Sequence, residues 1–156
     1  MATTQAGSAV EKAMRESLKL YAAGDRRFFS YLSNDVRVYT VGSSEPIVGR
    51  GAFENYFGPT FRKNKRKVSI IAKDVQTAAG QAILAQTLEI TANGVSSFVR
   101  QTVIWGEDDG GWKMRHIHNA MVGQPVISGR PPRTARSIRV INERIATVAA
   151  TVGMAQ

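Results

Sequence analysis

The only two histidines of the chain, His116 and His118, lie two residues apart in a stretch rich in β-forming residues. Successive strand side chains alternate between the faces of a sheet, so both imidazoles are predicted to share a face with Trp112 and Met114. An ordinary histidine has a pKa of about 6.5 and can transfer a proton near neutral pH. The strand therefore predicts either a ligand pocket with histidine acid–base chemistry or structural imidazoles hydrogen-bonded inside a sheet.

Two glutamines are predicted to lie side by side in a preceding hairpin. Asn93-Gly94, between two alternating runs, is a two-residue hairpin signal, and a turn there pairs Gln86 with Gln101. Their face is otherwise apolar, and an unpaired buried amide costs about 1–3 kcal/mol. The two amides are therefore expected either to bond to each other or to bind a polar group of a ligand.

The sequence offers few residues for a metal site, a thiolate site or a catalytic nucleophile. The chain has no cysteine, and no third histidine completes a tetrahedral metal set, although Glu16 could add a carboxylate. The glycines at 106, 110 and 111 lie in an acidic hairpin rather than a phosphate-binding loop. No Gly-x-Ser-x-Gly motif is present. We expect no metal and no cofactor.

The elements that position these residues begin with helices. Ser8 and Glu11 form a capping box, an apolar periodicity follows, and Gly24 ends the predicted first helix. Residues 25–32 and 49–61 are predicted as further helices, the latter bearing Phe53 and Phe57. Strands are predicted at 36–41 and 68–75 and in two hairpins, the second of which is bracketed by Trp105 and Trp112.

The composition changes after Pro125. Residues 126–136 are predicted to be a basic Gly/Pro linker. Residues 137–156 are predicted to contain an amphipathic helix, because apolar residues recur at helical spacing. Such a helix is expected to pack on the domain, taken as residues 1–125, or on a partner subunit.

Three segments resemble one known family. They are Ala23-Gly24-Asp25, the stretch 48–57, and the stretch 111–118 with its Gly-Trp and two histidines. Together they resemble the nuclear transport factor 2-like superfamily, also called SnoaL-like or ketosteroid-isomerase-like, and most closely the association (hub) domain of calcium/calmodulin-dependent protein kinase II. The resemblance implies an α+β fold in which a cone-shaped, curved antiparallel sheet wraps around N-terminal helices, here with an extra C-terminal helix.

The resemblance also bears on activity. In ketosteroid isomerases a loop Asp moves the proton, and a Tyr and a second Asp hold the oxyanion. Those positions fall on Tyr39, near Glu16, and near Gln101, so isomerisation by that set is not expected. The arginines with which the hub domain binds carboxylates fall on Val103 and Asn119.

The resemblances to the isomerase and to the hub domain disagree about which alternate residues of the last strand face the pocket. The isomerase pattern turns Met114, His116 and His118 toward the pocket, whereas the hub pattern turns Asn119 inward; a bulge would reconcile them. We follow the first pattern because it also places Trp112 inside.

The net charge of +9 is concentrated in two places, residues 62–67 and the arginines between 130 and 144. Basic runs can bind phosphates, but solvated loops and helix ends explain them as well, and no aromatic residue is interleaved with the second cluster. Nucleic acid is therefore a minority hypothesis. No membrane span or secretory signal is expected, and we predict a cytoplasmic protein.

The sequence favours a small-molecule-binding pocket protein, with acid–base catalysis (isomerase, cyclase, dehydratase or decarboxylase) left open. A non-catalytic oligomeric hub is the alternative, and an accessory protein for nucleic acid or acidic partners is the third. A homodimer or higher homo-oligomer is expected. The candidate catalytic residues are His116, His118 and Tyr39. The candidate ligand-binding residues are Gln86, Gln101, Trp105, Trp112, Met114, Phe53, Phe57 and Glu16.

Overall fold

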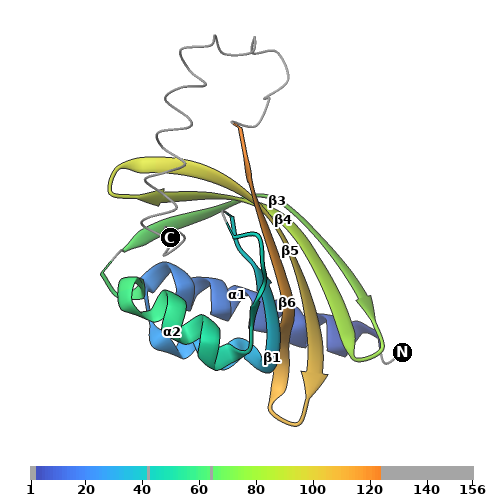
Figure 1. The fold of residues 1–156 in the computed structure, drawn as a ribbon. Coiled ribbons are helices and arrows are strands. Elements are labelled where there is room, and N and C mark those ends of the chain that lie inside the picture. The colour runs from blue at the N-terminus through green and yellow to red at the C-terminus, as the bar shows by residue number, and fades with distance from the viewer. Residues whose placement is uncertain (1–2, 42, 64, 124–156) are drawn as a thin grey trace, which may run out of the picture.

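The computed structural model describes residues 3–41, 43–63 and 65–123. Helices come first and a sheet follows: α1 (Thr3–Ala23), the 3-10 helix η1 (Arg26–Tyr31), β1 (Leu32–Tyr39), β2 (Ile47–Val48), α2 (Arg50–Phe61), β3 (Arg66–Ala78), β4 (Gln81–Ala92), β5 (Val95–Asp108) and β6 (Gly111–Val122). The sheet curves over the helices (Figure 1). The α+β class and the cone-like arrangement predicted above are confirmed.

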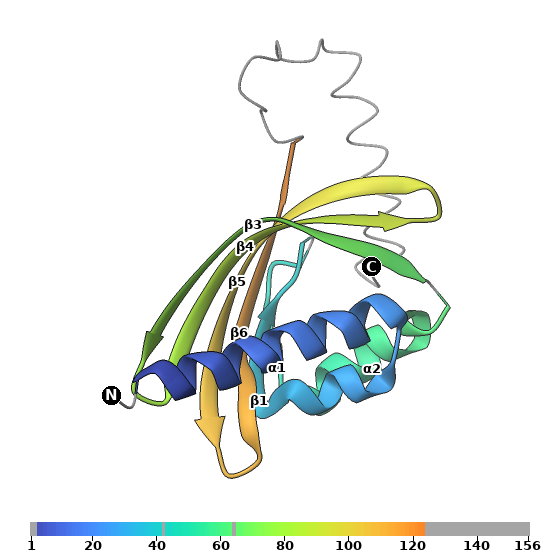
Figure 2. The same cartoon turned by 180° about the vertical axis from the view of Figure 1, so that it is seen from behind.

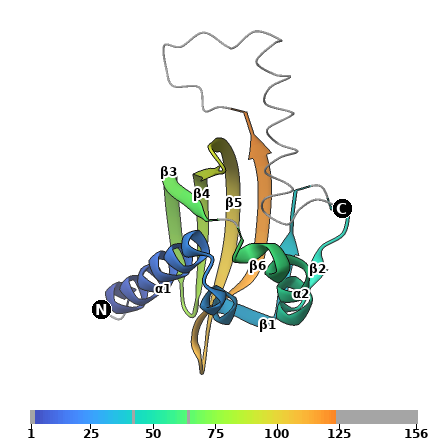
Figure 3. The ribbon, with the colours of Figure 1, turned by 90° about the vertical axis from the view of Figure 1, so that its left-hand side faces the viewer.

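The six strands form one open sheet in the order β2-β1-β6-β5-β4-β3. Every neighbouring pair is antiparallel except β1 and β6, which run parallel, so the sheet is mixed rather than wholly antiparallel. Both α-helices lie on the same side of the sheet (Figure 3). That side is the concave face of the fold.

The first helix begins at Thr3, before the predicted capping box at Ser8, and ends where the sequence predicted. Gly24 has φ +66, its N–H donates to the Tyr21 carbonyl, and the Asp25 N–H donates to the Leu20 carbonyl. These two bonds form a Schellman motif, which favours glycine. Figure 2 shows α1 running beneath the strands toward α2.

The first long hairpin has the predicted turn and register. Asn93 and Gly94 both have positive φ, 52 and 76, as a type I′ turn requires. Gln86 pairs with Gln101 and Leu84 pairs with Val103 across β4 and β5. The turn was therefore sufficient to predict which residues of β4 and β5 pair and share a face.

The last strand contains a bulge at Arg115 that the sequence analysis did not place. Trp105 pairs with Met114 but Ile104 pairs with His116, so Arg115 has no opposite residue. A Cβ at Gly106 would overlap the Arg115 side chain, and the glycine leaves room for it. The extra residue reverses the alternation of faces beyond Met114.

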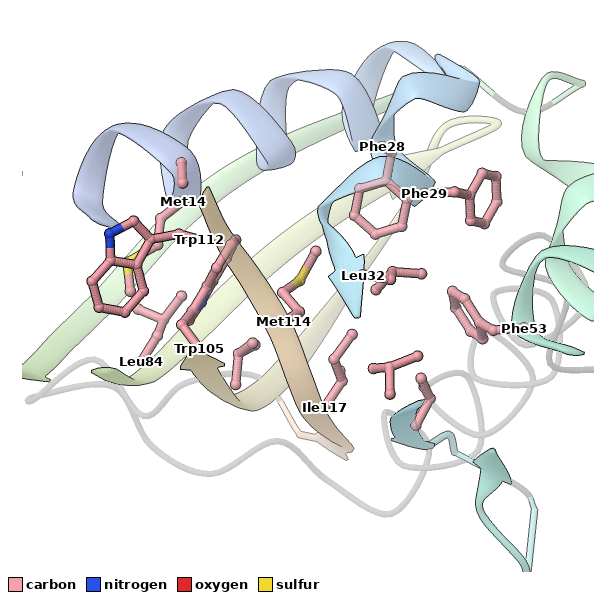
Figure 4. Packing of buried hydrophobic residues seen from close by; sticks show 14 of the residues in the cluster. Met14, Phe28, Phe29, Leu32, Phe53, Leu84, Trp105, Trp112, Met114 and Ile117 are labelled. Atoms are coloured by element: carbon pink, nitrogen blue, oxygen red, sulfur yellow. The ribbon is translucent and has the colours of Figure 1, made fainter. Parts of the chain in front are cut away.

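The core between the helices and the sheet is rich in aromatic side chains. Trp105 is 1% exposed and lies near Trp112, Met14 and Leu84 (Figure 4). At the other end five phenylalanines pack together, with ring centroids as close as 5.0 Å; they are Phe28, Phe29, Phe53, Phe57 and Phe61. This packing holds α2 and η1 against the strands.

One cation is buried within this aromatic end. The Arg66 guanidinium lies 4.8 Å from the ring centroid of Tyr21 and 5.0 Å from that of Phe61. Its Nη1 donates to the Tyr21 carbonyl (3.1 Å) and its Nη2 to the Phe61 carbonyl (3.4 Å). Both carbonyls belong to the last turns of helices, where positive charge is favourable. Arg66 therefore joins the carboxyl ends of α1 and α2.

The predicted linker at 126–136 and the predicted helix at 137–156 lie outside the described residues.

Candidate functional site

A cavity of about 330 Å³ lies between the helices and the concave face of the sheet. Its sheet wall includes Leu84, Leu88 and Val103, and its helix wall includes Met14 and Phe57. Most of the lining is apolar, as is usual for small-molecule sites. The curvature of the sheet and the position of α1 across it create this space.

A line of polar side chains crosses the apolar wall. Lys73 pairs with Gln86, Gln86 with Gln101, and Gln101 with Asn119, so one residue from each of β3, β4, β5 and β6 stands in the same row. All four line the cavity. We call Lys73, Gln86, Gln101 and Asn119 the polar row.

The three amides of the polar row are hydrogen-bonded in one direction. Gln86 Nε2 donates to Gln101 Oε1 over 2.7 Å, and Gln101 Nε2 donates to Asn119 Oδ1 over 2.9 Å. The two glutamines therefore satisfy each other, and the chain of bonds extends one strand further. Gln86 Oε1 and Asn119 Nδ2 have no hydrogen-bond partner among the described residues. The row ends in a free acceptor on β4 and a free donor on β6.

Two further polar groups of the cavity wall lack a partner. The Thr40 hydroxyl and the Trp105 indole N–H are buried and make no hydrogen bond within the described part of the chain. Thr40 follows Tyr39, which pairs with His118, so Thr40 lies next to Asn119 and extends the row toward β1. A ligand with a hydrogen-bonding group could bond to the Thr40 hydroxyl or to the Trp105 indole N–H.

The charged residues of the cavity lining are Arg15, Lys19 and Lys73, and all three are exposed cations. Among the described residues no aspartate, glutamate or histidine lines the cavity. Tyr21 also lines it, and burial raises the pKa of this phenol, an effect that the Arg66 charge partly offsets. Tyr21 therefore remains protonated at neutral pH.

Six of the eight predicted ligand-binding residues line this cavity: Gln86, Gln101, Trp105, Met114, Phe53 and Phe57. Trp112 is buried in the core and Glu16 lies at the surface; neither is part of the lining. Glu16 instead accepts a hydrogen bond from the Tyr31 hydroxyl (2.8 Å). Burial and this bond raise the pKa of Tyr31.

The predicted orientation of the histidines is wrong. The bulge at Arg115 leaves Trp112 and Met114 on the concave face but turns His116 and His118 to the convex face, and neither lines the cavity. Tyr39 lies with them, its ring centroid 5.2 Å from that of His116 and 6.0 Å from that of His118. The three candidate catalytic residues are therefore together, but on the opposite side of the sheet from the cavity.

A family model for the SnoaL-like domain matches residues 10–123. The chain belongs to the SnoaL-like domain family. This match covers α1 to β6, which are the elements that enclose the cavity. No curated protein matches the chain.

Solved structures share the fold of this SnoaL-like chain at low sequence identity. The CaMKII hub of S. rosetta is 21% identical, with a TM-score of 0.61, over 74% of this chain and 95% of that one. A provisionally assigned dehydratase of the NTF2-like family from Streptomyces avermitilis is 17% identical, with a TM-score of 0.69, over 79% of this chain and 99% of that one. An NTF2-like protein from Novosphingobium aromaticivorans is 14% identical, with a TM-score of 0.66, over 80% of this chain and 87% of that one. Identities this low establish the fold and leave the activity to be argued from the site.

The residues predicted from the sequence did not include eight polar residues that line the SnoaL-like cavity: Arg15, Ser17, Lys19, Tyr21, Thr40, Tyr56, Lys73 and Asn119. Asn119 had one usable signal, since the hub comparison turned it inward. Lys73 faces the cavity because a bulge at Ile71 shifts the register of β3. Nothing in the local sequence marks that bulge.

The described segments contain no group of three or more His, Asp or Glu side chains that could hold a metal ion. None of their helices has an apolar stretch of membrane-spanning length.

Proposed function

We propose that this SnoaL-like domain binds a small, largely apolar molecule in the cavity between α1 and the sheet. The observation that supports this most is the polar row, which crosses an otherwise apolar wall and ends in an unused acceptor and an unused donor. Binding pockets commonly combine an apolar lining with a few fixed polar groups that orient the ligand.

The cavity volume limits the size of the ligand. At about 30 Å³ for each water in the liquid, 330 Å³ corresponds to roughly eleven waters. A molecule of about ten to fifteen non-hydrogen atoms would fill it. This volume is at the lower end of the ~300–1,000 Å³ found for small-molecule sites.

The lining supports binding better than acid–base catalysis by a histidine. A general acid or base must reach the reacting group within hydrogen-bond distance. His116 and His118 lie on the convex face, and the described lining has no carboxylate to replace them. Among the described lining residues, the side chains left to transfer a proton in an isomerase, cyclase, dehydratase or decarboxylase reaction are Tyr21, Tyr56, Lys19 and Lys73.

A thermal-shift screen tests the proposal. Neutral and anionic molecules of ten to fifteen non-hydrogen atoms are screened against the whole chain. A ligand at 100 times its Kd should stabilise the fold by about 2.7 kcal/mol. The same screen is repeated on Val99→Trp, which would fill the cavity from β5.

The control is Thr102→Trp, which adds the same side chain to the convex face of the same strand. Met121→Trp, at a half-buried lining position, is used if Val99→Trp does not fold. We expect the ligand-induced shift to disappear in the cavity variant and to persist in the control. A shift that persists in both, or a panel with no binder, contradicts the proposal.

A second candidate is a non-catalytic oligomeric hub. Two similar structures are hub or hub-homology domains, from S. rosetta and from Chlamydamonas reinhardtii (20% identity, TM-score 0.62). Apolar side chains are also exposed on the sheet, with Ile71 at 47% and Ile83 at 44%. Light scattering of the whole chain decides this candidate, because a single 17.0 kDa species would exclude it.

A further inference from the structure

We propose that Lys73, with Arg15 and Lys19 on the facing helix, forms an anion subsite at the rim of the cavity. The ligand would then have an apolar body, held inside, and one acidic group, such as a carboxylate, at this rim. The inference rests on the proposed binding function and adds the chemical class of the ligand. We call Lys73, Arg15 and Lys19 the cationic rim.

The cationic rim is part of the cavity and not simply a solvated surface. Lys73 pairs with Gln86, whose side chain is buried and faces the cavity, so Lys73 projects from the same concave face. Arg15 and Lys19 are one helical turn apart and therefore share a face of α1. All three residues border the same 330 Å³ space, and α1 packs against β3.

The positive charge of the rim is largely unused. Neither Lys73 nor Lys19 has an ion-pair or hydrogen-bond partner among the described residues, and Arg15 has only an exposed contact to Glu11 at 3.8 Å. The three cations point to an anion, because no carboxylate of the described cavity lining balances them. Opposite charges attract more strongly beside an apolar cavity than in bulk water.

The polarity of the polar row agrees with this assignment. Its donors all point from β4 toward β6, so the amide next to Lys73 ends in a free acceptor and the amide next to Thr40 ends in a free donor. A cation beside the acceptor end stabilises that direction of the row. The rim thus attracts the acidic group of the ligand, and the Asn119 end remains available to an oxygen deeper in the ligand.

Matched acids and amides test the subsite. We would measure, by calorimetry, the binding of 4-phenylbutyrate and 4-phenylbutyramide, and of decanoate and decanamide, to the whole chain. Within each pair the apolar body is the same and only the charge of the head group differs. Each has about twelve non-hydrogen atoms, close to the roughly eleven water volumes of the cavity.

The variants are Lys73→Gln and a matched control, Lys67→Gln. Lys67 is exposed on the same strand but pairs with Thr91 on the convex face, and it does not line the cavity. Each acid should bind the unaltered chain roughly tenfold more tightly than its amide, and Lys73→Gln should remove most of that difference. Lys67→Gln should preserve it, and added salt should reduce it.

The outcomes separate the two proposals. If acids and amides bind equally, or if Lys73→Gln keeps the preference, the subsite is wrong while the binding function stands. If neither acids nor amides bind and the thermal-shift panel also has no binder, both proposals fail. A preference lost equally in Lys67→Gln would reflect the net charge of the chain and would overturn the subsite.

Discussion

Two cations of β3, Arg66 and Lys73, face the same side of the sheet and have opposite surroundings. Arg66 is 5% exposed, donates to two helix-end carbonyls and lies against the rings of Tyr21, Phe57 and Phe61. Lys73 is exposed and has no partner among the described residues. One charge is used by the fold, and the other is available to a ligand.

The difference follows from where each residue meets the helices. Arg66 lies where α1 and α2 both end, and burial lowers the pKa of its guanidinium, which nevertheless keeps its charge because an arginine titrates far above neutral pH. Lys73 lies farther along β3 and lines the cavity, whose lining does not include Arg66. A buried charge needs protein partners, whereas a charge at a cavity rim can take its partner from a ligand.

The largest expected effect is the loss of the Arg66 contacts. Arg66→Met should lower the free energy of unfolding by roughly 2–4 kcal/mol, because two charge-assisted hydrogen bonds and three cation–π contacts disappear. Lys73→Met should change it by less than about 0.5 kcal/mol. Urea denaturation of both variants measures the contrast. If both variants lose the same free energy of unfolding, Arg66 does not stabilise the fold more than Lys73 does.

The next effect concerns the middle of the polar row. Gln101→Met removes both hydrogen bonds of the row and should cost roughly 1–2 kcal/mol. Gln101→Glu is the matched variant, since Gln86 and a rotated Asn119 amide can both donate to a carboxylate, and it should keep most of the stability. If Gln101→Met and Gln101→Glu lower the free energy of unfolding equally, the hydrogen bonds of Gln101 do not stabilise the row.

Much of this arrangement could be predicted from local chemistry. Asn93-Gly94 fixed the turn, the turn fixed the pairing of Gln86 with Gln101, and the apolar alternation around them fixed their face. The five phenylalanines of the core also lie in the predicted helical segments. These features depend on neighbours in the sequence or on a tight turn, so one chain is sufficient to predict them.

The rest of the site depends on two bulges. The bulge at Ile71 brings Lys73 into the cavity, and the bulge at Arg115 turns His116 and His118 out of it. A shift of one residue exchanges the two faces of a strand. Gly106, over which the Arg115 side chain lies, was the one available signal, because a glycine inside a strand often marks a bulge. No comparable glycine accompanies Ile71.

A smaller effect should appear at alkaline pH. Burial raises the pKa of Tyr21 above its ordinary value of 10.0. The neutral phenol therefore contributes stability that is fully present below pH 10 and is lost as the pH rises toward the higher folded-state pKa. The slope is at most about 1.4 kcal/mol per pH unit for one proton. Tyr21→Phe keeps the ring against Arg66 and should lose less stability above pH 10 than the unaltered chain, as measured by denaturation at several pH values.

The smallest expected effect is at the histidines, and it tests the face assignments directly. His116→Gln with His118→Gln alters two side chains of the convex face, where His118 is exposed and neither imidazole touches the cavity. The free energy of unfolding should change by about 0.5 kcal/mol or less, as for other surface substitutions. The ligand-induced thermal shift should also be unchanged, whereas Lys73→Gln should reduce it for acidic ligands. Had β6 kept a regular alternation, the same double substitution would alter the cavity wall beside Met114 and abolish the shift. A lost shift would therefore place the histidines in the cavity and make the Arg115 bulge wrong, whereas an unchanged shift agrees with their position on the convex face.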